Sequence, residues 1–236
     1  DLIVVAVVVF FAILTQAISG SGLALVAMPL LVPVLGPLTA ASLVALIAVT
    51  TQIVMLARYR RALSVGGLWR LMLGSLVGIP IGVVALAQLD SRVILTVLGV
   101  LLVGYALYSL FAPPLPQIHN LTWGYGFGFV SGLLGGAYNT GGPPYVIYGV
   151  TQRWEAQAFK ANLQVLLMVN SVTVVIAHLA AGHFTTPVLE NYAIAFPMIL
   201  VGAFTGFWLD RYIDEARFRK IVLVLLLIIG AKMLLT

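Results

Sequence analysis

The segment Gly135-Gly-Ala-Tyr-Asn-Thr-Gly-Gly-Pro-Pro144 interrupts an apolar stretch that runs from Leu121 to Val150. Glycine frees the backbone and proline removes a hydrogen-bond donor, so together they break a helix. A second apolar stretch, from Leu2 to Gly36, is broken in the same way around Ser19-Gly-Ser-Gly22. Both stretches are therefore expected to form discontinuous helices or re-entrant hairpins.

Six other apolar segments have the length of about 20 residues that a helix needs to cross a bilayer. They run from Leu38 to Ala57, Leu68 to Gln88, Val93 to Phe111, Ala158 to Ala181, Val188 to Leu209 and Phe218 to Leu235. The first run, Leu2 to Ile18, lacks the basic region and cleavage site of a signal peptide, and we expect it to belong to the fold. Of the 236 residues, 62% are hydrophobic and only 8% are charged, against about 25% charged in a soluble domain. The sequence thus predicts an all-α integral membrane protein.

The residue types argue against several functional classes. The net charge of +5 does not indicate nucleic-acid binding, because the basic residues form short clusters between apolar runs, as they do where they orient a membrane protein. The chain has no cysteine and three scattered histidines, so we expect no disulfide, metal or other cofactor. All seven acidic residues fall at termini or in connectors, which disfavours a carboxylate-based cation pump. We find no Ser/His/Asp arrangement, paired catalytic carboxylates or HExxH motif, and predict that the protein is not an enzyme.

The two halves of the chain resemble each other. A Pro-rich connector, Ala112 to Asn120, divides them, and we predict two repeats, 1–118 and 119–236, each with one broken segment and three transmembrane helices. Two sets of residues recur in order, at offsets of 115 and 124: Gly20 and Pro29 match Gly135 and Pro144, and Leu76-Val-Gly78, Gly82 and Asp90 match Leu200-Val-Gly202, Gly206 and Asp214. This common order indicates an internal duplication of the kind that transporters use.

The basic residues predict that the second half is inverted. With four simple crossings in each half, the cluster Arg58 to Arg70 would lie opposite the clusters Arg153 to Lys160 and Arg211 to Lys220, against the positive-inside rule. If each broken segment instead returns to its starting side, or forms two short crossings, ten of the twelve basic residues share one face. Arg92 and Lys232 then lie on the other face. The Pro-rich connector is expected on the cytoplasmic side.

The two breaks mark the expected binding site, because irregular backbone at membrane depth survives only where it is buried in protein or lines a polar cavity. Two amides, on comparable helices of the two halves, are added to the residues of the breaks. The candidate site residues are Gln16, Ser19, Gly20, Ser21, Gly22, Gln52, Tyr138, Asn139, Thr140, Gly141, Gly142 and Asn170. Glycine N–H groups and the positive ends of two half-helices suit an anion.

Two further sets of residues have other expected roles. The glycines at positions 74, 78, 82, 202 and 206 are expected to allow close packing between helices. A proton relay through His178, with His183 in the next loop, is left open.

Two segments, Ile18-Ser-Gly-Ser-Gly-Leu-Ala-Leu-Val-Ala-Met-Pro-Leu-Leu31 and Gly128-Phe-Val-Ser-Gly-Leu-Leu-Gly-Gly-Ala-Tyr-Asn-Thr-Gly-Gly-Pro-Pro-Tyr-Val-Ile-Tyr148, resemble the TauE/SafE family of sulfite exporters. The likeness continues through Tyr59-Arg-Arg-Ala62, Gly78-Ile-Pro-Ile-Gly82 and Arg217-Phe-Arg-Lys-Ile-Val-Leu223, and so covers essentially the whole chain. The resemblance implies a permease of the bacterial or archaeal inner membrane for sulfite, organosulfonates or related anions. It also implies that the anion binds near residues 19–22 and 139–142.

Our hypothesis is secondary transport, in the direction of export, of a small sulfur-containing anion by alternating access at a midplane site. Ser19, Ser21, Asn139 and Thr140 are the proposed side-chain ligands. An anion channel of the same architecture is the nearest alternative, and an intramembrane enzyme acting on lipid or sulfur compounds is a third. The expected partners are the anion and the lipid bilayer, and association into a homo-oligomer is left open.

Overall fold

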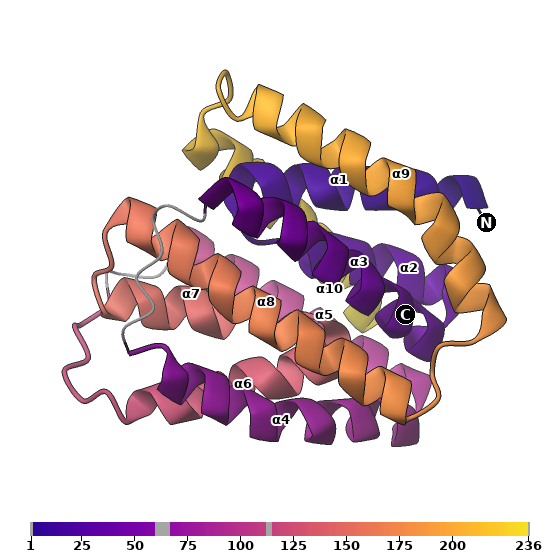
Figure 1. The fold of residues 1–236 in the computed structure, drawn as a ribbon, viewed down its shortest axis with the longest axis horizontal. Helices are drawn as coiled ribbons and strands as arrows, with labels where there is room; N and C mark the ends of the chain where they lie inside the picture. The colour runs from indigo at the N-terminus through magenta and orange to yellow at the C-terminus, as the bar shows by residue number, and fades with distance from the viewer. Residues whose placement is uncertain (1, 60–66, 112–114, 236) are drawn as a thin grey trace.

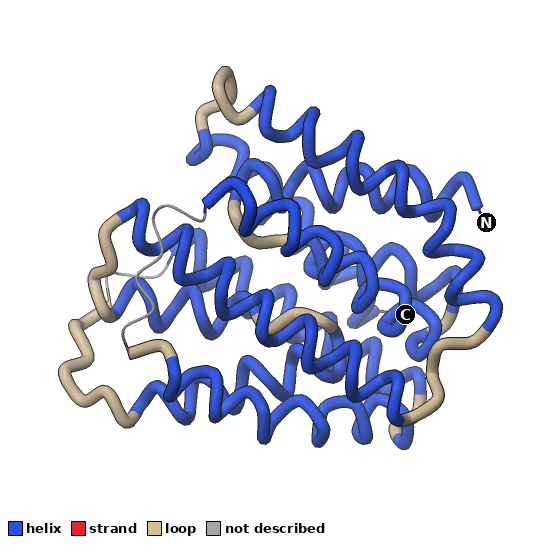
Figure 2. The backbone as a smooth tube through the Cα atoms, viewed as in Figure 1, coloured by secondary structure: helices blue, strands red, loops and turns tan. Residues whose placement is uncertain are grey.

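A computed structural model describes residues 2–59, 67–111 and 115–235 of the chain. The described part is helical and contains no β-strand (Figures 1 and 2). Its helices are α1 (Leu2–Ser19), α2 (Leu23–Leu35), α3 (Pro37–Tyr59), α4 (Trp69–Gln88), α5 (Ser91–Phe111), α6 (Trp123–Tyr138), α7 (Gly142–Thr151), α8 (Ala156–Ala180), α9 (Thr186–Leu209) and α10 (Glu215–Leu235). The predicted all-α architecture is confirmed.

Six of the described helices are long and apolar enough to cross a membrane, namely α1, α3, α4, α5, α8 and α9. Helix α10 has 21 residues, but Arg219, Lys220 and Lys232 lie within it. Large apolar side chains such as those of Phe204 and Ile228 lie on the outside of the helical bundle, as they do where lipid replaces water. The chain is a multi-pass membrane protein.

Each predicted broken stretch forms two helices that make a hairpin. In the first half, Gly20 to Gly22 separate α1 from α2, and in the second half Asn139 to Gly141 separate α6 from α7. Figure 1 shows α1 beginning and α2 ending toward the right of the view, whereas α6 begins and α7 ends toward the left. The two hairpins thus open toward opposite ends of the bundle.

Helices from the two halves pack against each other in symmetric pairs. Helix α1 packs along α9, and α4 packs along α6, while α3 lies against α8 and α5 against α10. Exchanging the first five helices for the last five leaves these four pairings unchanged. The inverted repeats themselves stay a prediction, which this packing pattern favours.

One of the two sequence matches between the halves does not correspond to equivalent positions. Gly20 lies in the break after α1, but Gly135, at an offset of 115, lies inside α6. The glycines that directly precede the second helix of each hairpin are Gly22 and Gly141. Because glycine is frequent in all these segments, the identity of Gly20 and Gly135 is a chance match, and the offset of 115 does not align the two breaks. The match at 124 does place Gly78 and Gly202 on corresponding helices, α4 and α9.

Glycines bring α4 and α6 into direct backbone contact. A Cβ atom on Gly74, Gly78 or Gly82 of α4 would overlap the carbonyl oxygens of Tyr125, Phe129 and Leu133, respectively. On α6, a Cβ on Gly128, Gly132 or Gly136 would overlap the carbonyl oxygens of Leu71, Ser75 and Ile79. The α1–α9 contact is looser on this measure, since a Cβ on Gly202 would lie 3.0 Å from the carbonyl oxygen of Phe10. The packing role expected for these glycines is confirmed.

The charged residues gather at the ends of the helices. The Pro-rich connector is fixed beside the end of α7, where Ile118 N–H donates to Thr151 O (3.3 Å) and Gln152 Nε2 donates to Ile118 O (2.7 Å). Arg92 and Lys232 line one groove between α2, α5 and α10. Arg60 and Arg61 of the predicted basic cluster, and residues 112–114 of the connector, lie outside the described residues.

Candidate functional site

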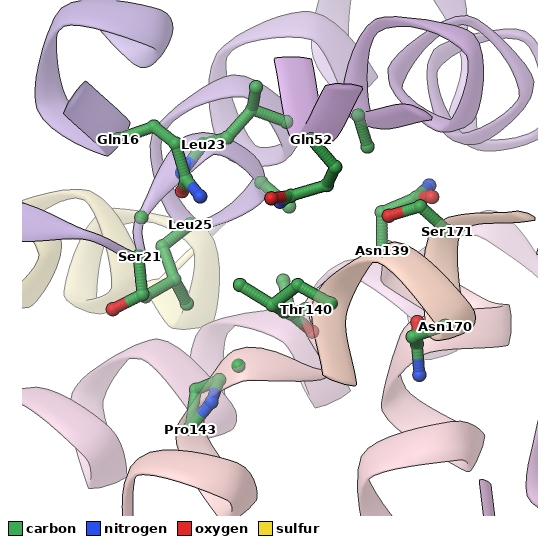
Figure 3. Close-up of a pocket in the computed structure, with 15 residues that line it drawn as sticks. Gln16, Ser21, Leu23, Leu25, Gln52, Asn139, Thr140, Pro143, Asn170 and Ser171 are labelled. Atoms are coloured by element: carbon green, nitrogen blue, oxygen red, sulfur yellow. The ribbon is translucent and has the colours of Figure 1, made fainter. Parts of the chain in front are cut away.

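A cavity touches both breaks. Helices α1, α2 and α3 of the first half and α7 and α8 of the second half meet around it (Figure 3). The lining residues are Gln16, Ser21, Gly22, Leu23, Ala24, Leu25, Ala48, Gln52, Asn139, Thr140, Gly142, Pro143, Leu167, Asn170 and Ser171. None of these side chains carries a charge.

The first break is held by two glutamines. Gln16 Nε2 and Gln164 Nε2 both donate to the carbonyl oxygen of Gly20, at 3.3 and 2.9 Å. Gln16 Oε1 accepts from the N–H of Leu23 at 3.1 Å, which caps the first residue of α2. Gly20 and Gly22 have φ of 74° and 139°, a region that side-chain-bearing residues rarely adopt. The amide of Gln16 therefore shapes the break, and both of its ends are already used.

The second break is held by Asn139. Its backbone adopts the left-handed conformation (φ 55°) that ends α6, a conformation that asparagine tolerates better than most residues. Its Nδ2 donates to the carbonyl oxygen of Ala41 on α3 at 2.8 Å. The Ser131 hydroxyl donates to the carbonyl oxygen of Gly141 in a short hydrogen bond. Each break is thus tied to a long helix of the other half, the first to α8 and the second to α3.

Some carbonyl groups at the breaks are occupied, whereas several backbone N–H groups at the cavity have no acceptor within the described residues. The carbonyl oxygens of Gly20, Leu134 and Gly141 accept hydrogen bonds from protein donors. In contrast, no hydrogen bond within the described residues occupies the N–H groups of Ala24 and Leu25, in the first turn of α2. The Gly142 N–H at the start of α7 has no acceptor there either.

The start of α7 has fewer donors than the sequence interpretation assumed. Pro143 and Pro144 occupy its first turn, and proline has no N–H group. Both helices still direct the positive end of their dipole toward the cavity. The hydrogen bonds to a ligand would therefore come mainly from α2, with Gly142 as the contribution of α7.

Two of the buried amides that line the cavity have an atom without a hydrogen-bond partner among the described residues. These are Gln52 Oε1 on α3 and Asn170 Nδ2 on α8, and both residues are only 3% exposed. Figure 3 shows the Gln52 side chain reaching toward Leu25 and Thr140. The Asn170 amide fits inside the α6–α7 hairpin, because a Cβ on Gly135 would overlap its Oδ1. Because a buried polar atom gains from a hydrogen bond, the Gln52 Oε1 atom is a point at which a polar ligand or water can complete the hydrogen bonding.

The chain was also compared with known protein families. The model of the sulfite exporter TauE/SafE family matches residues 5–233. The chain belongs to this family. It is therefore a member of a family of membrane transporters and not of an enzyme family. Searches of curated proteins and of solved structures found no significant match.

Within this TauE/SafE member, the structure brings eight of the twelve predicted site residues to the cavity. They are Gln16, Ser21, Gly22, Gln52, Asn139, Thr140, Gly142 and Asn170. The other four lie beside it: Gly20 and Gly141 use their carbonyl groups as described, Tyr138 packs into the apolar core, and Ser19 donates from its hydroxyl to Thr15 O (2.7 Å). Whether any of the twelve binds substrate stays a prediction.

Sequence reasoning missed the remaining lining residues of this TauE/SafE site. Leu23, Ala24, Leu25, Ala48, Pro143, Leu167 and Ser171 line the cavity as well. The first three contribute through their position at the start of α2, which the break itself predicts. Ser171 directly follows the predicted site residue Asn170 on α8, and this position in the sequence could have indicated it.

The histidine pair of this TauE/SafE member lies apart from the cavity. His178 Nδ1 is 2.9 Å from His183 Nδ1 and 3.3 Å from the Ser42 hydroxyl, near the end of α8. Neither histidine lines the cavity between the breaks. A proton relay through His178 would need further titratable groups between this pair and the cavity, and none of the residues that line the cavity is titratable in the usual pH range.

Proposed function

We propose that the protein is a secondary transporter that exports sulfite, an organosulfonate or a related small sulfur-containing anion. The anion binds in the cavity between the two breaks, and access alternates between the two sides of the membrane. Family membership supports transport, and the hydrogen-bond pattern at the breaks supports an anion as the substrate.

The observation that carries this proposal is a set of backbone N–H groups at the cavity that have no acceptor. These are the N–H groups of Ala24, Leu25 and Gly142, within the part of the chain that the structure describes. An anion needs such free N–H donors and a positive helix end. The site therefore suits an oxyanion.

The uncharged walls support release as well as binding. A buried arginine or lysine would hold an anion by charge, and a tightly held ion leaves slowly. Backbone N–H groups, hydroxyls and amides compensate part of the lost hydration without that full attraction. Such a site fits a transporter that must release its substrate on the other side.

A reconstitution experiment tests this proposal. We expect purified protein in liposomes to take up sulfite or a sulfonate when a panel of sulfite, sulfoacetate, thiosulfate and sulfate is compared. Uptake should saturate and should show counterflow, because a carrier exchanges substrate across the membrane whereas a channel does not. Transport would be disproved if no anion moved and none bound to protein of demonstrated fold.

A charge variant supplies the control for that experiment. Gln52→Glu puts a carboxylate of nearly the same shape into the uncharged cavity, and we expect at least about a tenfold loss of uptake from repulsion. Gln88→Glu makes the same change at an exposed position at the end of α4 and should transport like the wild type. Equal activity of both variants would remove Gln52 from the site.

A further inference from the structure

A second cavity lies against the first break on its other side. It lies among α5, α7, α8 and α10. Its lining residues are Ser19, Ser21, Gly22, Leu25, Tyr105, Val146, Val150, Phe159, Arg219, Val222, Leu223 and Leu226. Ser21, Gly22 and Leu25 also line the cavity between the two breaks, so the two spaces share this turn of chain as a wall.

The second cavity leads toward one end of the bundle. Arg219 lies near the start of α10, Phe159 near the start of α8 and Val150 at the end of α7. Figure 1 shows these three helix ends on the left of the view, the side toward which the α6–α7 hairpin opens. The cavity therefore runs from the first break toward that end of the molecule.

Hydroxyl groups mark the route between the two cavities. The Ser21 hydroxyl makes no hydrogen bond within the part of the chain that the structure describes, and in Figure 3 it points away from Gln52 and Thr140. Ser21 lines both spaces. Its hydroxyl can therefore contact an anion in the second cavity, while the backbone of α2 can contact an anion in the cavity between the breaks. Tyr105 adds a second hydroxyl to the wall, whereas the Ser19 hydroxyl already donates to Thr15 O.

Arg219 is the single charged residue among those that line this cavity. The Arg219 side chain is exposed to solvent and also lines the cavity. Its charge therefore lies at the opening. A positive charge in a concave opening raises the local concentration of anions and their rate of entry. Because water screens an exposed charge, Arg219 is expected to change the rate at which anions enter the cavity and not the affinity of the deeper site.

We propose that the second cavity is an entry site for the anionic substrate, and that Arg219 captures the anion before it passes Ser21 into the cavity between the breaks. The inference rests on the proposed transport function, which it deepens by adding an access route and a residue that acts on it. The ligand class is a small oxyanion or sulfonate, because the wall provides one guanidinium and the hydroxyls of Ser21 and Tyr105. The guanidinium fork suits the oxygens of such an anion.

Transport kinetics provide the first test. We expect Arg219→Gln to raise KM for sulfite or sulfoacetate about threefold to tenfold with little change in kcat, because capture and not translocation is weakened. Arg219→Lys should retain most of the wild-type KM. Arg217→Gln is the matched control, since Arg217 pairs with Asp214 (3.4 Å) and points away from Arg219 on the same helix. A wild-type KM in Arg219→Gln would overturn the proposal.

A labelling experiment tests the cavity without transport. Val222→Cys places a thiol in the wall on α10, in a chain without other cysteines. We expect it to react faster with 2-sulfonatoethyl methanethiosulfonate than with the trimethylammonium reagent, by about threefold or more relative to exposed Gln117→Cys. Adding Arg219→Gln should abolish that preference. Equal ratios at both cysteines would contradict an anion-attracting cavity, whereas absence of transport with a preserved ratio would contradict only the transport function.

Discussion

Ser21 is the side chain whose loss should affect the anion most cleanly. Its hydroxyl has no recorded partner among the described residues and borders both cavities. We expect Ser21→Ala to weaken anion binding by about 1 to 3 kcal/mol if the hydroxyl donates to a desolvated charge, with thermal stability unchanged. Isothermal titration of sulfoacetate, together with thermal unfolding in detergent, measures both quantities. Wild-type affinity would remove the hydroxyl from the route.

Asn139 differs from Ser21 because it has two structural duties. Its amide donates to Ala41 O on α3, and its backbone lies in the left-handed region. Asn139→Ala should therefore lose stability as well as affinity, the backbone alone costing roughly 1 to 2 kcal/mol. Asn139→Gly separates the two, because glycine adopts this conformation but has no amide. If Asn139→Gly bound the anion as well as the wild type, the amide would have a structural role only.

At the scale of elements, the α4–α6 pair should be the most sensitive contact to added volume. A Cβ on Gly132 would overlap the carbonyl oxygen of Ser75, and backbone atoms of two packed helices cannot yield as a side chain can. We expect Gly132→Ala to destabilise the protein by about 1 to 3 kcal/mol or to prevent folding. Gly126→Ala on the same helix is the control, since nothing lies within 4 Å of its Cβ position.

Thermal unfolding of the two alanine variants, followed by size-exclusion chromatography in detergent, checks this expectation. Gly126→Ala should be neutral or slightly stabilising, because alanine favours a helix over glycine by up to about 1 kcal/mol. Similar melting temperatures for both variants would show that the helices can separate without cost. In that case the close α4–α6 contact would not be a rigid element of the fold.

At the scale of the whole molecule, the charge distribution predicts the orientation in the membrane. Inverted halves put the Pro-rich connector and the start of α10 in the cytoplasm, and the turns at 90–92 and 182–187 outside. The opening of the second cavity would then face the cytoplasm, as an exporter requires. The directions of the helices in Figure 1 favour this arrangement.

Single cysteines and an impermeant thiol reagent in intact cells test the orientation. Asp90→Cys and Thr185→Cys should be labelled, and Gln117→Cys and Tyr212→Cys should be labelled only after the cells are opened. All four positions are exposed in the structure, so a missing signal reflects sidedness rather than burial. Labelling of Tyr212→Cys from outside would contradict the inverted arrangement and would favour two parallel halves.

The amino-acid sequence by itself determined the features that depend on neighbouring residues. Apolar runs of membrane-spanning length and Gly-Pro interruptions predicted the helices and both breaks, since these properties are local. Repeated glycines four residues apart predicted close packing, because they form one smooth face on a helix. The residues around each break were found for the same reason, and eight of the twelve line one cavity.

Only the tertiary structure decided which polar groups remain available to a ligand. Gln16 looked like a ligand, but its amide is used at Gly20 and Leu23, and Gly20 is also bound by Gln164, 144 residues away. Asn139 is likewise bound to Ala41, 98 residues away. Such partners are chosen by the packing of distant helices, which no local pattern records. The same packing placed Arg219 of α10 on a cavity that touches the first break, which lies about 200 residues earlier in the chain.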